Sequence, residues 1–337
     1  MRAKMPRLPH LLLLGLALVA SLPGRAGAQD GLTIYSSQHA ALTHEWAAAF
    51  TARTGIPVTV RRNTDVVLAN QIVQEGTRSP ADVFLTENSP AMVLVEAAGL
   101  FAPVAPATLA QVPAEFRPSS GKWTGIAARA TVFAYNTTRL AEADLPKSML
   151  DLAKPEWRGR WGAAPAGADF QAIVSAVLEL RGEAETAAWL VGLKANALAY
   201  RGNFEAMRGV NLGEVEGAVI YHYYYFGDRA GTGESSDKVA LHYFRNEDPG
   251  AFVSVSGGGV LASSRNPEAA QAFLAFVTGP EGQAVLRDGN SHEYVIGIGV
   301  DPGSELPPLA TLGYPKVDPS LLNARAVVGL MTAAGVL

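Results

Sequence analysis

Short apolar runs alternate with segments of helical spacing between residues 32 and 98. The first apolar run, Leu32-Thr33-Ile34-Tyr35, has the length and composition of a buried strand. Two further strands are predicted at 57–60 and 81–86. Apolar residues spaced three and four apart predict helices at 41–54, at 65–75 with Asp65 as its cap, and at 90–98. This alternation is typical of an α/β region in which helices cover a mostly parallel sheet.

A second α/β region follows the first. Its predicted strands are 131–135, 217–221 and 251–255, and its predicted helices are 170–181, 186–193 and 268–278. Gly257-Gly258-Gly259 predicts a tight turn after the last strand, and residues 321–337 predict a helix docked on the body of the protein. Two α/β regions predict two lobes, an arrangement in which a ligand is enclosed by hinge motion.

The N-terminus has the pattern of an export signal. Arg2, Lys4 and Arg7 precede ten apolar residues, Leu11 to Ala20, and small residues follow at Ala26-Gly27-Ala28. Ten residues at about 1.5 Å per residue do not cross a bilayer core of about 30 Å. We therefore predict a signal peptide at 1–28 and a periplasmic location, with a buried N-terminal helix as the alternative.

Composition and charge exclude several classes of protein. The 337-residue chain has no cysteine, which excludes disulfides, Cys-ligated zinc or iron–sulfur clusters, a thiol nucleophile and a lipoprotein anchor. Residues 1–28 hold four basic and no acidic side chains, so the remainder carries 23 Lys and Arg against 31 Asp and Glu, a net charge of −8. An acidic chain of this kind predicts no nucleic-acid partner. No later apolar run reaches 18 residues, so we expect no membrane-embedded segment.

Polar side chains follow three of the predicted strands. His39 comes after the first strand, Glu87 after the strand at 81–86, and Tyr223 and Tyr224 after the strand at 217–221. In open α/β sheets, ligands bind beyond the carboxyl ends of the strands. Each residue also has a structural alternative: a loop histidine, a helix N-terminal acid, or packed aromatics. Adjacent tyrosines can share one target only at an irregular strand-to-helix corner, and position 222 offers one.

These residues lie within motifs that resemble those of periplasmic ferric-ion-binding proteins of ABC-type iron importers. The motifs are LTIYSSQH (32–39), TGIPVTV (54–60), PADVFLTEN (80–88), EAAGLFAPV (96–104), KPEWRGRWG (154–162), GEVEGAVIYHYYYF (213–226), NEDPGAFVSVSGGGVL (246–261) and HEYVIG (292–297). The resemblance implies a two-lobed periplasmic-binding-protein fold of type II. The implied lobes comprise 29–129 with about 254–304, and about 130–253 with 305–337.

The resemblance also implies a function without catalysis. The chain would bind a ferric ion or ferric chelate between its lobes as a monomer, and deliver it to an inner-membrane permease coupled to an ATPase. The implied iron ligands are His39, Glu87, Tyr223 and Tyr224. Hard oxygen donors suit Fe³⁺, and two phenolates with one carboxylate balance its three charges. Because a phenol has a pKa near 10, binding should release protons and weaken in acid.

The chain departs from the family pattern where many members hold a synergistic phosphate. The matching turn is Gly167-Ala168-Asp169, where Asp169 is expected to cap the next helix and its carboxylate would repel phosphate. Asn203 matches one anion-binding asparagine, but Tyr221 stands in place of a second. We therefore expect carbonate or water near Arg129, or an oxygen ligand from Asp169 or Tyr225, instead of phosphate. For Arg129, a surface salt bridge is the alternative interpretation.

Two other functions stay open at this point. The same fold could bind an organic anion, a polyamine or a sugar, with the tyrosines stacked on it. A secreted hydrolase could use Glu87 and Asp169 as a carboxylate pair. His44-Glu45 and His292-Glu293 lack the second histidine of a zinc-binding H-E-x-x-H helix, and no catalytic arrangement is recognised.

Overall fold

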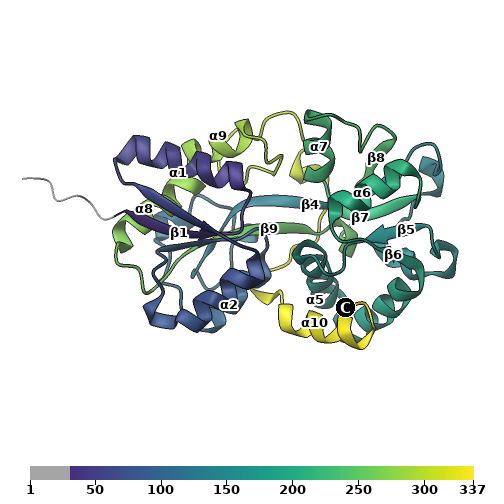
Figure 1. Cartoon of the computed structure of the whole chain (residues 1–337), viewed down its shortest axis with the longest axis horizontal. Coiled ribbons are helices and arrows are strands. Elements are labelled where there is room, and N and C mark those ends of the chain that lie inside the picture. Colours follow the sequence, from purple (N-terminus) through teal and green to yellow (C-terminus); the bar gives the residue numbers. More distant parts are fainter. Residues whose placement is uncertain (1–30) are drawn as a thin grey trace, which may run out of the picture.

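The protein folds into two α/β lobes joined by two long strands. The computed structural model describes residues 31–337, and the predicted signal peptide lies outside them. The strands are β1 (Leu32–Ser36), β2 (Val58–Arg62), β3 (Val83–Leu85), β4 (Thr124–Asn136), β5 (Trp161–Ala163), β6 (Ala197–Ala199), β7 (Gly217–Tyr221), β8 (Val239–His242) and β9 (Val253–Val260). In Figure 1, β4 and β9 run across the middle of the molecule from one lobe to the other.

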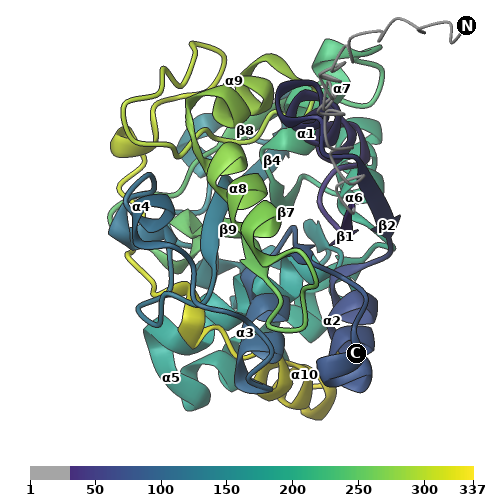
Figure 2. The same ribbon diagram turned by 90° about the vertical axis from the view of Figure 1, so that its left-hand side faces the viewer.

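Helices flank the strands on both sides of this crossing. They are α1 (Ala40–Thr54), α2 (Asp65–Glu75), α3 (Ser89–Ala97), α4 (Pro106–Leu109), α5 (Ala168–Asn196), α6 (Asn203–Leu212), α7 (Tyr223–Ala230), α8 (Pro267–Thr278), α9 (Pro280–Asp288) and α10 (Ala324–Ala333). Figure 2 shows the first lobe facing the viewer, with α1, α8 and α9 above and α2 and α3 below. Between residues 31 and 337, no helix combines the length and the apolar character needed to cross a bilayer.

The sheet is parallel within each lobe and antiparallel at the crossing. Its order is β2-β1-β3-β9-β4-β7-β5-β6, with β8 paired to β4. β1 is parallel to β2 and β3, and β5 is parallel to β6 and β7. β9 and β4 run antiparallel to each other and to their outer neighbours. The predicted two-lobed α/β class is therefore confirmed.

β4 changes partner halfway along its length, where the lobes meet. It pairs with β9 through Ala130 and with β7 from Thr131 onward. The predicted strand at 131–135 is the second half of this longer element. The predicted lobe boundaries, which divide the chain near 129/130 and near 253/254, stay a prediction.

Each lobe has its own apolar core. Trp46, Phe50 and Phe273 are fully buried in the first lobe, and Phe133 and Trp161 in the second. α10 contributes Val327 and Met331 to the second core, as the predicted docked C-terminal helix requires. This burial of large side chains supplies most of the favourable free energy that holds each lobe together.

Two local predictions differ from the structure. The glycines 257–259 lie inside β9 and do not form a turn. Cβ atoms at Gly257 and Gly259 would collide with the side chains of Met92 and Phe101, so these strand positions require glycine. The helices predicted at 170–181 and 186–193 are two arms of α5 that meet at Gly182, whose φ of 78° breaks the helical geometry. Glycine is the residue that adopts this left-handed conformation without strain.

Substitution of Gly217 tests how closely β7 packs on β4. A Cβ at Gly217 would collide with the buried ring of Phe133, so we expect Gly217→Ala to lower the free energy of unfolding by about 1–3 kcal/mol. Urea unfolding of the metal-free protein measures this change. The control is Gly329→Ala in α10, where an added Cβ meets no atom within 4 Å. We expect the control to stabilise the helix by up to about 1 kcal/mol, and equal losses in the two variants would contradict the prediction.

Candidate metal-binding site

Four side chains predicted as metal ligands extend from the ends of three strands. His39 is the N-cap residue of α1, three residues after the end of β1, and Glu87 lies two residues after the end of β3. Tyr223 and Tyr224 begin α7, and only His222 separates them from β7. The strand-to-helix corner that two adjacent tyrosines need is therefore present.

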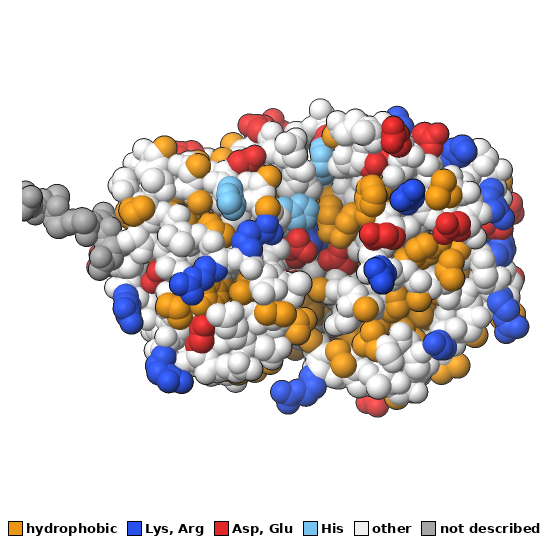
Figure 3. All heavy atoms as spheres, viewed as in Figure 1, with side chains coloured by type: hydrophobic (Ala, Val, Ile, Leu, Met, Phe, Trp, Pro, Cys, Tyr) orange, Lys and Arg blue, Asp and Glu red, His pale blue; other side chains and the backbone are white. Residues whose placement is uncertain are grey.

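The structure brings all four side chains together. His39 Nε2 lies 3.6 Å from Glu87 Oε1. The His39 and Tyr223 ring centroids are 4.8 Å apart, and the Tyr223 and Tyr224 rings stack at 4.2 Å. His39 and both tyrosines line a cavity of about 330 Å³ whose wall also includes Asp228 and His292. In Figure 3, histidine and acidic side chains gather at the junction of the two lobes.

The Asp169 carboxylate lies at the centre of this group. Oδ2 accepts hydrogen bonds from the phenol groups of Tyr223 (3.1 Å) and Tyr224 (3.0 Å), and from Asn203 Nδ2 (2.8 Å). Oδ1 accepts a bond from Asn88 Nδ2 at 2.9 Å. The expectation that Asp169 caps α5 is wrong, because Gly167 is the N-cap residue and the Asp169 side chain makes no capping bond. Its carboxylate is instead satisfied by four side chains from both lobes.

Three further candidates for an anion site are Gly167, Ala168 and Tyr225. Gly167 and Ala168 form the start of α5, where the Gly167 N–H is already bonded to Ala164 O at 3.0 Å. Tyr225 does not line the cavity that His39, Tyr223 and Tyr224 share, and its ring lies 5.4 Å from that of Phe226. The structure therefore separates Tyr225 from the site.

Arg129 lies beneath the site on β4 and is completely buried, so its interpretation as a surface salt bridge is wrong. Nη1 is 3.8 Å from Asp169 Oδ1 and 4.0 Å from Glu87 Oε2. Nη2 forms a buried ion pair with Glu293, which the sequence did not single out as a site residue. A buried guanidinium with carboxylates on both sides holds together a dense cluster of charge.

Burial controls the protonation of the candidate site. It raises the pKa of Tyr223 and Tyr224, and the nearby Asp169 carboxylate raises both further. Burial also raises the pKa of Glu87 to about 8, although Arg129 opposes the shift. The pKa of His39 is lowered by burial, although Glu293 opposes the shift. Without a cation the phenols thus keep their protons near neutral pH, and His39 is a neutral nitrogen donor.

Asp65 positions Glu87, a role that the sequence analysis missed. Its carboxylate accepts the backbone N–H groups of Glu87 and Asn88, each at 3.0 Å, and the Ser37 hydroxyl. Asp65 was expected to cap α2, but Thr64 is the N-cap residue of that helix. The sequence signal for this role was a polar residue shortly after β2, because the carboxyl ends of β1, β2 and β3 lie on one edge of the sheet.

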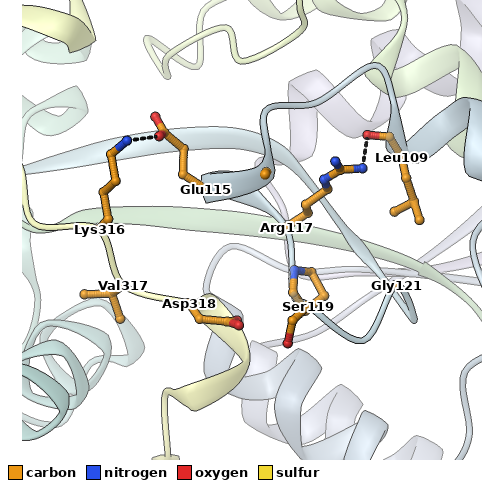
Figure 4. A pocket seen from close by; sticks show the side chains of 10 residues that line it. Leu109, Glu115, Arg117, Ser119, Gly121, Lys316, Val317 and Asp318 are labelled. Atoms are coloured by element: carbon orange, nitrogen blue, oxygen red, sulfur yellow. Dashed lines mark hydrogen bonds and ion pairs between the residues drawn. The ribbon is translucent and has the colours of Figure 1, made fainter.

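Two observations limit the kind of site that the structure supports. Within residues 31–337, no three His, Asp or Glu side chains form a metal-binding cluster by themselves. A larger cavity of about 570 Å³ lies elsewhere, between residues 109–121 and 316–318, and Figure 4 shows the Glu115–Lys316 ion pair on its wall. None of the predicted site residues lines it.

Two α/β lobes that meet at a polar cavity define a solute-binding protein. Residues 78–304 match the family model described as "Bacterial extracellular solute-binding protein". The chain belongs to this family of bacterial solute-binding proteins.

Several relatives align with nearly the whole chain. The "Fe(3+)-binding periplasmic protein" of Serratia marcescens is 56% identical over 329 residues, which are 98% of this chain and 97% of the relative. The "Major ferric iron-binding protein" of Neisseria meningitidis serogroup B is 36% identical over 93% of this chain and 94% of the relative. The structure of iron-bound HitA from Pseudomonas aeruginosa is 43% identical and superposes with a TM-score of 0.85, covering 91% of this chain and 100% of that one.

Removing the Asp65 carboxylate should destabilise the loop that carries Glu87. Asp65→Ala leaves two backbone N–H groups without an acceptor, one buried and one partly buried, so we expect the free energy of unfolding to fall by about 2–4 kcal/mol in urea unfolding. The control is Asp301→Ala, which removes an exposed carboxylate bonded to one turn N–H, with an expected change below about 0.5 kcal/mol. A loss no larger than that of the control would contradict the role of Asp65.

Proposed function

We propose that this protein is the periplasmic component of an ABC-type importer, and that it binds Fe³⁺ with His39, Glu87, Tyr223 and Tyr224. One observation carries the proposal: two adjacent phenol oxygens converge on a single carboxylate oxygen, with an imidazole and a second carboxylate beside them. Hard, charged oxygen donors in such a set suit a small trivalent cation. The names of the relatives, which specify ferric iron, support the same cargo.

The hydrogen bonds of the two phenols fit this cargo. Tyr223 and Tyr224 donate hydrogen bonds to Asp169 Oδ2. A cation that binds the phenol oxygens must displace the phenol protons, and only a strongly polarising ion compensates for the cost of forming two buried phenolates. An organic anion, a polyamine or a sugar stacked on the rings would leave both phenols protonated, so proton release on binding distinguishes a ferric ion from these alternative ligands.

We propose further that the Asp169 carboxylate takes the place of a synergistic anion. Around a small octahedral cation with bonds of about 2.0–2.1 Å, neighbouring ligand oxygens lie about 2.9 Å apart. Asp169 Oδ2 already lies 3.1 and 3.0 Å from the two phenol oxygens, which is close to that spacing. Carbonate near Arg129 was the alternative, but Asp169 Oδ1 lies on the side of Arg129 that carbonate would use.

The proposal includes location, partner and lobe organisation. The signal-like residues 1–28 and the relative named as periplasmic support export to the periplasm. Delivery to a permease and its ATPase, a monomeric state, and the division of the lobes near 129/130 and 253/254 belong to the same proposal. The named relatives are binding proteins, so we propose no enzymatic role. Four hydrogen-bond donors engage the Asp169 carboxylate, which argues against its use as a hydrolytic acid or base.

Phenolate–iron bonding should give the loaded protein a visible colour. Titration of the metal-free protein with ferric citrate is expected to produce an absorption band that saturates at one ion per chain. Tyr223→Phe combined with Tyr224→Phe should abolish the band, because no phenolate is then left at the site. Tyr225→Phe is the matched control and should retain it, since Tyr225 does not line the cavity that His39, Tyr223 and Tyr224 share. A colourless native protein, or a band that survives the double substitution, would contradict the proposed ligands.

Bicarbonate dependence distinguishes Asp169 from a bound anion. If Asp169 is a ligand, native iron affinity should not change when bicarbonate is added to a bicarbonate-free buffer. Asp169→Ala should weaken binding roughly 10- to 100-fold, and bicarbonate should restore part of the loss by entering the vacated position. Competition with a chelator such as citrate measures both affinities. A native protein that requires bicarbonate would show that Asp169 does not replace the anion.

A further inference from the structure

Glu293 is a buried carboxylate that none of the predicted roles uses. It follows α9, and neither oxygen is exposed to solvent. Its Oε1 pairs with Arg129 Nη2 and accepts hydrogen bonds from Ser256 Oγ at 3.1 Å and Gln38 Nε2 at 3.4 Å. These partners come from β4, from β9 and from the turn before α1. Glu293 therefore joins the crossing strands to the segment that carries His39.

Arg129 presents opposite sides to Glu293 and to the candidate metal site. Nη2 faces Glu293, whereas Nη1 faces Glu87 and Asp169 at 4.0 and 3.8 Å. Nη1 is buried and makes no hydrogen bond within the described part of the chain. Glu293 thus fixes one side of the guanidinium. The other side is attracted to the Glu87 and Asp169 carboxylates but makes no hydrogen bond with them.

This arrangement affects the charge that a bound cation would meet. A guanidinium keeps its positive charge at every relevant pH, and a positive charge beside a ferric ion is repulsive. Arg129 without a counter-charge would also attract Glu87 and Asp169 away from the metal. Glu293 supplies the missing counter-charge from the side away from the ligands.

Glu293 also reaches the histidine ligand through Gln38. Gln38 Nε2 donates to Glu293, and Gln38 Oε1 accepts the backbone N–H of His39 at 2.7 Å. The Gln38 carbonyl is held in turn by Arg62 Nη2 at 2.9 Å. One carboxylate thus orients two groups that border the site: the Arg129 guanidinium and the segment that presents His39.

We propose that Glu293 is a positioning residue for the ferric site, which neutralises Arg129 at the crossing of β4 and β9 and holds the segment that presents His39. This inference rests on the proposed iron-binding function. Groups that orient metal ligands without touching the metal typically change metal affinity 10- to 100-fold when they are removed.

The first test separates the charge of Glu293 from its shape. Glu293→Gln keeps the size of the side chain and an oxygen that can accept from Gln38, but it removes the charge. Glu293→Asp keeps the charge on a shorter side chain. Ferric affinity, measured by citrate competition at the visible band, should fall roughly 10- to 100-fold in the Gln variant and about threefold in the Asp variant. A role in packing alone would give the opposite order, and that order would overturn the inference.

A double substitution provides the second test. Arg129→Gln with Glu293→Gln removes both charges and leaves no unpaired buried ion. The double variant should bind iron more tightly than Glu293→Gln alone, because the uncompensated guanidinium is gone. If Glu293→Gln does not fold, the inference requires the Asp variant to stay within about threefold of native affinity and the double variant within about 100-fold. A Glu293→Asp variant that binds iron more weakly than the double variant would overturn the inference.

The control and the native protein keep the two proposals distinguishable. Glu216→Gln breaks the Arg160–Glu216 pair, whose Nη2–Oε2 distance is 2.6 Å and which lies away from the site, so iron affinity should not change. A native protein that develops no band refutes the iron-binding function itself. A native protein that binds iron, together with a Glu293→Gln variant of native affinity, refutes only the role of Glu293.

Discussion

The hydrogen bonds of the Asp169 carboxylate are the interaction on which the candidate site depends. Oδ1 is bonded by Asn88, which follows β3 in the first lobe, and Oδ2 is bonded by Asn203 and two tyrosines of the second lobe. A side chain bonded from both sides of the cleft fixes the distance between the lobes as well as the directions of the phenols. Hydrogen bonds to an ionised acceptor are about twice as strong as neutral ones, which makes this carboxylate an effective fixed point.

The crossing of β4 and β9 places the charges that surround this fixed point. Arg129 lies one residue before the end of the β4–β9 pairing, where the strand passes from one lobe to the other. Buried carboxylates without a counter-charge would cost several kcal/mol each, so the guanidinium makes their close approach tolerable. Ser256, on the facing part of β9, contacts both Arg129 and Glu293 and completes the cluster. The strand crossing is thus an electrostatic centre as well as a mechanical link.

The sequence predicted the parts of the site that depend on local pattern. His39, Glu87 and the tyrosine pair follow strands whose apolar runs are easy to recognise, and parallel strands gather their carboxyl ends at one edge. Two interpretations were wrong, the Asp169 cap and the alternative surface salt bridge of Arg129, because the local contexts of these residues are ambiguous. An aspartate before a helix resembles a cap, yet here its partners lie up to 81 residues away. Arg129 is paired with a residue 164 positions away, and no local pattern reports that distance.

The same limit applies to backbone elements with unusual composition. Three consecutive glycines favour a turn when only neighbours in sequence are considered, but β9 needs them because Met92, Ile126 and Phe101 occupy the space of their side chains. Two of these neighbours precede β9 by more than 150 positions. Close packing between distant segments therefore overrides local propensity at this strand, as it commonly does in sheets.

The distribution of the proposed ligands between the lobes has a consequence for binding and release. His39 and Glu87 extend from β1 and β3, whereas Tyr223 and Tyr224 extend from the end of β7. An ion that needs both pairs is held fully only when the lobes are closed, so its affinity contributes directly to the closed state. Opening the lobes divides the ligand set and separates Asp169 from Asn88 in the same movement. In the proposed function, binding, closure and the loss of two phenolic protons would form one coupled equilibrium, and any partner that favours the open lobes would lower the affinity for the ion by the same free energy.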